Sequence, residues 1–191
     1  LAQLFALEFT SPIWVVLLAP IFLKEQLTFR KVCIAALGFL GVLFVTRPEI
    51  GSLSIGIIAA ATAAIGFAAS AMITRKLTET DSLTKILFFL TGLQIIFGLI
   101  CSGYDGEITI PSPDNASWVV MIGLAGLSAH FCLTKSLTLA PASVVMPVDF
   151  VRLPLIAIIG MSFYGENLDI FMVTGAAMIL VANYINLNHR K

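Results

Sequence analysis

Charged side chains are scarce in this sequence, and this scarcity decides the class of protein. Lys, Arg, Asp and Glu together make up 12% of the 191 residues, whereas 59% are hydrophobic. Soluble domains contain about 25% charged and roughly 45–50% apolar residues. A chain this short cannot hide so much apolar surface, because a small domain leaves a large share of its surface in contact with solvent. The surrounding solvent is therefore expected to be lipid.

Basic residues are not in excess, and ligands for metals are few. Eleven basic and eleven acidic residues give a net charge of zero, so we expect no nucleic-acid partner. The three cysteines, Cys33, Cys101 and Cys132, lie in apolar stretches without metal-ligand spacing, and we interpret them as packing residues. No phosphate-binding GxxxxGK[ST] loop occurs. We expect no cofactor and no metal site.

Seven apolar segments are separated by clusters of charge. We place them at Leu4–Leu23, Val32–Thr46, Leu53–Thr74, Leu83–Cys101, Trp118–Leu139, Ala142–Tyr164 and Ile170–Leu187. A bilayer core needs about 20 mostly apolar helical residues. The second segment is short, but its flanking basic side chains can reach back to the interface. The sequence thus predicts an all-α polytopic membrane protein with seven transmembrane helices.

The distribution of Lys and Arg predicts the orientation of these segments. If they alternate in direction, one side receives Lys24, Arg30, Lys31, Arg75, Lys76, Lys85, Lys135, Arg190 and Lys191, and the other receives only Arg47. Basic residues accumulate on the cytoplasmic side of membrane proteins. We therefore expect a cytoplasmic C-terminus, with the acidic loop 102–117 on the opposite side.

Two stretches of the chain match each other at an offset of 141 residues. Glu25-Gln26-Leu27, followed after seven residues by Ala35-Ala36, matches Glu166-Asn167-Leu168 and Ala176-Ala177. The same offset relates Glu8-Phe9 to Asp149-Phe150, and a proline follows each acidic–Phe pair. Five predicted spans separate the two glutamates, so the copies lie on opposite sides of the membrane. Inverted repeats of this kind are typical of secondary transporters, whose substrate site lies near the midplane.

The repeat matches also resemble a known family. Phe9-Thr10-Ser11-Pro12-Ile13-Trp14, Lys24-Glu25-Gln26-Leu27 and Gly38-Phe39-Leu40-Gly41-Val42 resemble the end of a first EamA domain, and the stretches 140–147 and 164–168 resemble the same part of a second one. The resemblance covers essentially the whole chain and is specific for the drug/metabolite transporter superfamily. It does not identify a substrate.

The resemblance implies a ten-helix transporter of two inverted five-helix repeats, in a bacterial inner membrane. Residues 1–47 would be the last two helices of the first repeat, and residues 48–191 the five helices of the second. The chain begins at Leu1 inside an apolar run, and at an offset of 141 residues the first repeat would start roughly 94 residues before Leu1, so we expect about three further spans upstream. Solutes of the family include amino-acid, nucleoside-like, vitamin-like and drug-like molecules. The expected partners are a small-molecule substrate and the lipid bilayer, with the oligomeric state left open.

Ionisable residues inside a span are the candidates for the substrate site, because a charge in the bilayer is costly. Asp149 and Arg152 fall near the middle of the sixth span, and their i, i+3 spacing allows them to pair. The pair either fixes helix packing or borders the substrate path, where Arg152 would attract an anionic group and Asp149 a cationic group or a proton. A misplaced span boundary would instead leave both at the interface. Glu8, the repeat partner of Asp149, either lines the same cavity or lies at the interface.

Three further mid-span residues have groups that could contact a substrate. His130 is interpreted either as a neutral histidine bonded to a neighbouring helix or as a proton-coupling group. Gln94 and Trp14 could contact a solute by a hydrogen bond or an aromatic face, with packing as the alternative. Glu25 and Glu166 lie at span ends, and each is expected to cap or orient the helix that follows it.

These features favour a secondary carrier that moves a small organic metabolite by alternating access. One alternative is a membrane scaffold or regulatory fragment without transport activity. The least favoured is an intramembrane enzyme, because no HExxH or GxSxG motif occurs and His130 is the only histidine inside a predicted span.

Overall fold

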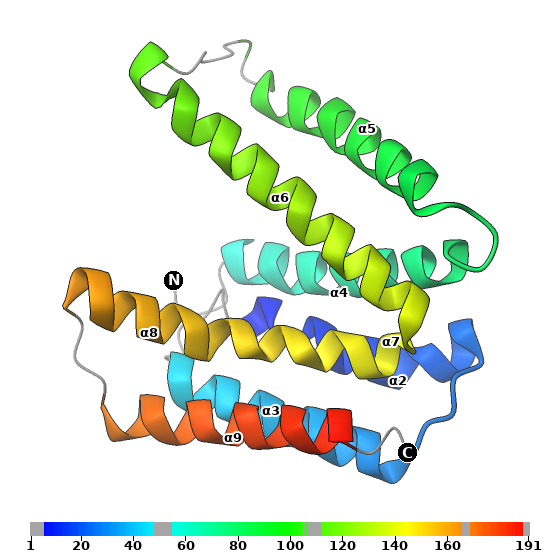
Figure 1. Cartoon of the computed structure of the whole chain (residues 1–191), viewed down its shortest axis with the longest axis vertical. Coiled ribbons are helices and arrows are strands. Elements are labelled where there is room, and N and C mark those ends of the chain that lie inside the picture. The colour runs from blue at the N-terminus through cyan, green and yellow to red at the C-terminus, as the bar shows by residue number, and fades with distance from the viewer. Residues whose placement is uncertain (1–5, 48–54, 105, 107–111, 166–168, 189–191) are drawn as a thin grey trace. The chain divides into compact units, whose positions relative to one another are not determined.

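Helices account for most of the described residues. The computed structural model describes residues 6–47, 55–104, 106, 112–165 and 169–188, and these contain no strand. The elements are α2 (Ser11–Leu23), α3 (Phe29–Thr46), α4 (Ile55–Leu77), α5 (Leu83–Ser102), α6 (Pro113–Leu139), α7 (Ala142–Val145), the 3₁₀ helix η1 (Met146–Val151), α8 (Arg152–Tyr164) and α9 (Ile170–Asn188) (Figure 1). The predicted all-α class is confirmed.

Seven helical stretches of the described chain are long and apolar enough to cross a membrane. They are Ala6–Leu23, Phe29–Thr46, Ile55–Leu77, Leu83–Ser102, Pro113–Leu139, Ala142–Phe163 and Ile170–Asn188. Each corresponds to one predicted segment, because the charge clusters that separate the segments also separate the helices.

Several helix ends extend beyond the predicted boundaries. Helix α3 begins at Phe29 rather than Val32, and α4 continues to Leu77. The prediction stopped at charged residues, but Lys and Arg are good helix formers, so each helix continues through them. Helix α6 begins at Pro113 rather than Trp118, since proline fits the first helical position, where no N–H donor is needed. The predicted loop 102–117 is correspondingly shorter.

The described chain forms two compact units. The first unit comprises the described residues of 1–73 and 140–191, and the second those of 74–139. In the first unit, α3 and α9 run side by side (Figure 1). Their contact is close, because a Cβ atom added to Gly41 would lie 2.7 Å from the carbonyl oxygen of Gly175. Small residues at such a contact let helix backbones approach each other.

The core of the first unit lies where α3, η1, α8 and α9 meet the turn before α2. It consists of Phe9, Val42, Phe150, Leu153 and Ile179, all buried. Gly38 belongs to the same packing, because a Cβ atom there would lie 2.5 Å from the ring of Phe150. The core therefore joins residues from both predicted repeats.

The helices of the first unit recur at the offset of the sequence repeat. Helices α2 and α8 each contain 13 residues, and their bounds are 141 positions apart at both ends (11 to 152 and 23 to 164). The residues after them, Lys24 and Gly165, both adopt the left-handed conformation, with φ of 55° and 67°. Helices α3 and α9 also begin 141 positions apart, at Phe29 and Ile170.

The second unit is built on α5 and α6, with the end of α4. Ser82 caps α5 by accepting a hydrogen bond from the Lys85 N–H, and Lys85 forms an ion pair with Asp81. The Arg75 guanidinium donates to the carbonyl of Leu137 near the end of α6, at 2.6 Å. Cationic groups are favourable at helix C-termini, where carbonyls lack partners inside the helix.

Candidate functional site

Two spans of the first unit are interrupted at corresponding positions. In the first span, residues 6–8 are helical, Phe9 and Thr10 form a turn, and α2 begins at Ser11. Pro12 in the first turn of α2 lacks the N–H that would bond to the carbonyl four residues earlier. One residue before that position, the carbonyl of Leu7 accepts hydrogen bonds from both the hydroxyl and the N–H of Thr10, at 2.6 and 3.0 Å. These bonds close the turn.

The sixth span, predicted at Ala142–Tyr164, is helical over Ala142–Phe163 and changes its winding in the middle. The span changes from α7 into the 3₁₀ helix η1 and then into α8. Pro147 and Pro154 remove two backbone donors from this stretch, which favours a local change in winding. The Asn186 amide of α9 donates to the carbonyl of Val144 at 2.9 Å, just before the change.

Glu8, Asp149 and Arg152, here called the charged cluster, meet at these interruptions. The Nη2 atom of Arg152 lies 2.9 Å from Oε1 of Glu8 and 3.6 Å from Oδ2 of Asp149. The predicted i, i+3 ion pair therefore forms, but the hydrogen bond of Arg152 goes to Glu8 on the other span. The three side chains are 49%, 36% and 45% exposed, in chain order, so the described residues bury none of them completely.

Two phenylalanines next to the carboxylates complete this arrangement. The rings of Phe9 and Phe150 lie 6.3 Å apart between centroids, and both are buried. The Arg152 guanidinium lies 4.7 Å from the centroid of the Phe9 ring, which is within the range of a cation–π interaction. Sequence reasoning used these residues only as markers of the repeat. Their contact shows that residues at equivalent positions of the repeat meet in space.

Gln94 and His130 pair in the second unit. Nε2 of Gln94 lies 3.3 Å from Nε2 of His130, so a hydrogen bond joins α5 and α6 at this point. Trp14 lies on α2 with 38% of its surface exposed. The structure thus brings together three of the six predicted site residues in one unit and two in the other.

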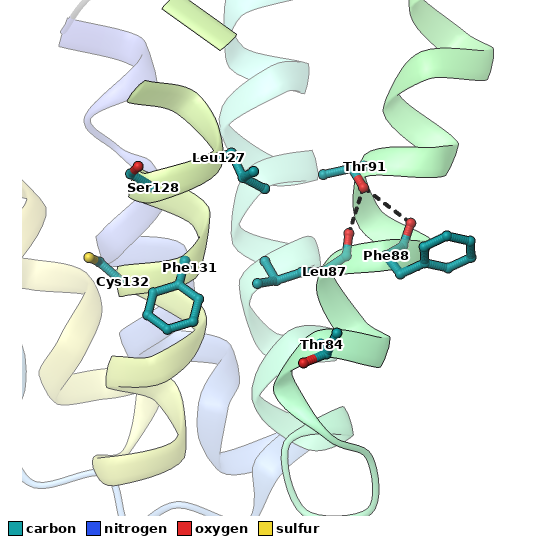
Figure 2. A pocket seen from close by; sticks show the side chains of 8 residues that line it. All are labelled: Thr84, Leu87, Phe88, Thr91, Leu127, Ser128, Phe131 and Cys132. Carbon is teal, nitrogen blue, oxygen red and sulfur yellow. Dashed lines mark hydrogen bonds between the residues drawn. The ribbon is translucent and has the colours of Figure 1, made fainter. Parts of the chain in front are cut away.

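A cleft of about 560 Å³ lies between α5 and α6 of the second unit. Figure 2 shows its lining: Thr84, Leu87, Phe88 and Thr91 on α5, and Leu127, Ser128, Phe131 and Cys132 on α6. The hydroxyls of Thr91 and Ser128 donate to carbonyls of their own helices. The cleft is therefore mainly apolar, and two of its three hydroxyls already have partners.

Glu25 caps a helix, but not the helix that was predicted. Its carboxylate accepts hydrogen bonds from the N–H groups of Ala142, at 2.7 Å, and Ser143, at 3.1 Å, and from the Ser143 hydroxyl. Lys31 also donates to the Ser143 hydroxyl, at 3.0 Å. The capped helix is thus α7, 117 residues away, rather than α3, because the free N–H groups of α7 lie within reach. Glu166 lies outside the described residues.

Arg47 and Asp169 form a second connection between distant segments that sequence reasoning missed. The two side chains form an ion pair, and the Arg47 guanidinium lies 4.1 Å from the centroid of the Phe171 ring. Asp169 also accepts hydrogen bonds from the N–H groups of Met172 and Phe171, at 3.0 and 2.9 Å, as a cap of α9. These hydrogen bonds, the one from Met172 first, and the charge of Arg47 hold the pKa of Asp169 below its usual value.

Known proteins resemble this chain over most of its length. The EamA-like transporter family matches residues 54–188. An uncharacterized transporter of Helicobacter pylori strain J99 is 28% identical over 97% of this chain and 64% of its own length. A riboflavin transporter of Brucella anthropi is 29% identical over 95% of the chain and 65% of its own length. An S-adenosylmethionine uptake transporter of Rickettsia felis is 24% identical over 92% and 59%. The chain thus spans less than two thirds of these relatives.

Proposed function

Because this chain belongs to the EamA-like transporter family, we propose that it is part of a secondary carrier for a small organic solute. The solute would cross the cytoplasmic membrane by alternating access of two inverted repeats. Relatives named as transporters of riboflavin and of S-adenosylmethionine support a small metabolite as the substrate class.

The charged cluster is the observation that carries this proposal. Glu8, Asp149 and Arg152 lie at interruptions of two membrane spans, close to two phenylalanine rings. Discontinuous helices with polar groups near the midplane form the substrate sites of many secondary transporters. Charges within spans are rare and mark solute or ion paths. The proposed substrate path therefore runs past this cluster.

The recurrence of helix bounds supports the division into two repeats. Helices α2 and α3 would end the first repeat, within residues 1–47, and α4 to α9 would form the second, within 48–191. The repeat-equivalent carboxylates Glu8 and Asp149 both lie within 4 Å of one guanidinium. When the two halves move relative to each other, a site at their junction opens first to one side of the membrane and then to the other.

Transport by the full-length protein in proteoliposomes tests this proposal. Labelled amino acids, nucleosides and vitamins, riboflavin among them, would be offered, and thermal stabilisation by each would be measured in parallel. A bound solute stabilises the folded state by about 2.7 kcal/mol at a hundred times its Kd. We expect Asp149→Asn to reduce uptake at least about ten-fold, the equivalent of roughly 1.4 kcal/mol.

The matched control is Asp81→Asn, which removes a carboxylate at the turn before α5 and should leave uptake unchanged. If Asp149→Asn folds with normal stability and transports a solute at the wild-type rate, the charged cluster does not line the substrate path. If no solute of any class is transported, a scaffold role becomes the better interpretation.

A further inference from the structure

The membrane-spanning part of the first unit carries an unbalanced charge. Among its described residues, the helices contain only five charged side chains: Arg30 and Lys31 in the first turn of α3, and the three residues of the charged cluster. Arg30 and Lys31 lie at the end of a span, and Lys31 is engaged with Gln26 and Ser143. Two carboxylates and one guanidinium remain, with a net charge of −1 when all are ionised.

The two carboxylates of the cluster are not equally satisfied. Glu8 accepts a hydrogen bond from Arg152 at 2.9 Å, a normal length for a charge-assisted bond. The nearest atoms of Asp149 and Arg152 are 3.6 Å apart, which is an ion-pair distance but too long for a hydrogen bond. Within the described part of the chain, the Asp149 carboxylate receives no hydrogen bond. Arg152 is thus already paired, and Asp149 is left to accept another donor.

From this imbalance we infer that the site binds solutes carrying a single positive charge, and that Asp149 accepts their cationic group. The inference deepens the proposed function and depends on it. An ionised carboxylate with accepting capacity left over attracts an ammonium or similar group by its charge and by charge-assisted hydrogen bonds. An anionic solute would meet a net negative site whose guanidinium is engaged with Glu8. The site therefore discriminates by charge, in favour of monocations.

Three probes of nearly the same size and shape test this inference: benzylammonium, benzyl alcohol and benzoate. They differ at one substituent, which is cationic, neutral or anionic at pH 7. Thermal stabilisation of the full-length protein in detergent is measured with each probe at millimolar concentration. We expect benzylammonium to bind at least about ten-fold more tightly than the other two, a difference of about 1.4 kcal/mol. Equal effects of all three, a preference for benzyl alcohol or benzoate, or no effect of any would overturn the inference.

Two variants separate the role of Asp149 from that of Arg152. Asp149→Asn removes the carboxylate and should abolish the preference for benzylammonium. Arg152→Gln leaves both carboxylates and should preserve or increase it, because the net charge becomes more negative. A loss of cation preference in Arg152→Gln, with its baseline stability unchanged, would contradict the assignment to Asp149.

The wild-type protein alone decides the charge preference, even if a variant fails to fold. Failure here is also distinct from failure of the proposed function. A protein that transports a solute in proteoliposomes but prefers benzoate would refute only the charge preference. A protein that transports nothing would refute carrier activity, whichever probe it binds.

Discussion

Replacing Glu25 by glutamine should weaken the connection between the loop after α2 and the start of α7. The carboxylate accepts three hydrogen bonds, from the N–H groups of Ala142 and Ser143 and from the Ser143 hydroxyl. Glutamine has one acceptor oxygen in place of two and no charge. Hydrogen bonds to charged groups contribute about 1.5–3 kcal/mol, and loss of an N-cap costs about 0.5–2 kcal/mol. Because Glu25 is half-buried and glutamine can keep one bond, we expect a loss of about 2 kcal/mol.

The free energy of unfolding is measured by denaturant titration of the protein in detergent micelles, with tryptophan fluorescence as the signal. Ser143→Ala removes one of these three bonds and also the hydrogen bond from Lys31, so it should destabilise the protein by about 1–2 kcal/mol. Glu79→Gln is the matched control, since Glu79 is exposed in the turn after α4 and makes no such cap. If Glu25→Gln destabilises no more than Glu79→Gln, the carboxylate contributes nothing to the α7 cap and our account of it is wrong.

Three further outcomes follow from packing, titration and backbone conformation. Gly41→Ala should destabilise the protein by about 1–3 kcal/mol in the same titration, because its Cβ would lie 2.7 Å from a backbone oxygen and from an Ile179 side-chain carbon. Gly66→Ala is the control, because its Cβ would meet no atom within 4 Å and the protein should keep its stability. The carboxylate of Asp169 stabilises the folded state above its unfolded-state pKa of about 3.9, and this stability is lost as pH falls through its lower folded-state pKa. Asp169→Asn should therefore reduce the dependence of the free energy of unfolding on pH at acid pH. Lys24→Gly should be about 1 kcal/mol more stable than Lys24→Ala, which loses the same charge but keeps a side chain at φ 55°.

The number of spans and the candidate charges could be predicted from the sequence for one physical reason. Lipid accepts apolar helices and penalises charges, so composition alone separates spans from loops and marks the exceptions. Asp149 and Arg152 were such exceptions, and their spacing predicted the ion pair that the structure contains. That they line a substrate path stays a prediction.

The interrupted spans could not be derived as directly. Pro147 and Pro154 were visible in the sequence, but proline is tolerated in membrane helices when other groups satisfy the freed carbonyls. Here the Asn186 side chain donates from α9, distant in sequence, to the carbonyl of Val144 just before the change in winding. The same limitation applies to Glu25, for which a local partner was assumed and a distant one is found. Contacts between segments far apart in the chain depend on tertiary packing, which periodicity does not specify.

The asymmetry of the charged cluster follows from one position at which the two matching stretches differ. Glu8 and Phe9 correspond to Asp149 and Phe150, but the position equivalent to Arg152 is occupied by Ser11, which is buried and uncharged. The guanidinium of Arg152 therefore pairs with both of the equivalent carboxylates. Its distance to Asp149 is set within one helix by the 3₁₀ and α windings, whereas its bond to Glu8 joins two helices. If the two halves move against each other as proposed, the bond to Glu8 is the one that changes, because Asp149 moves together with Arg152.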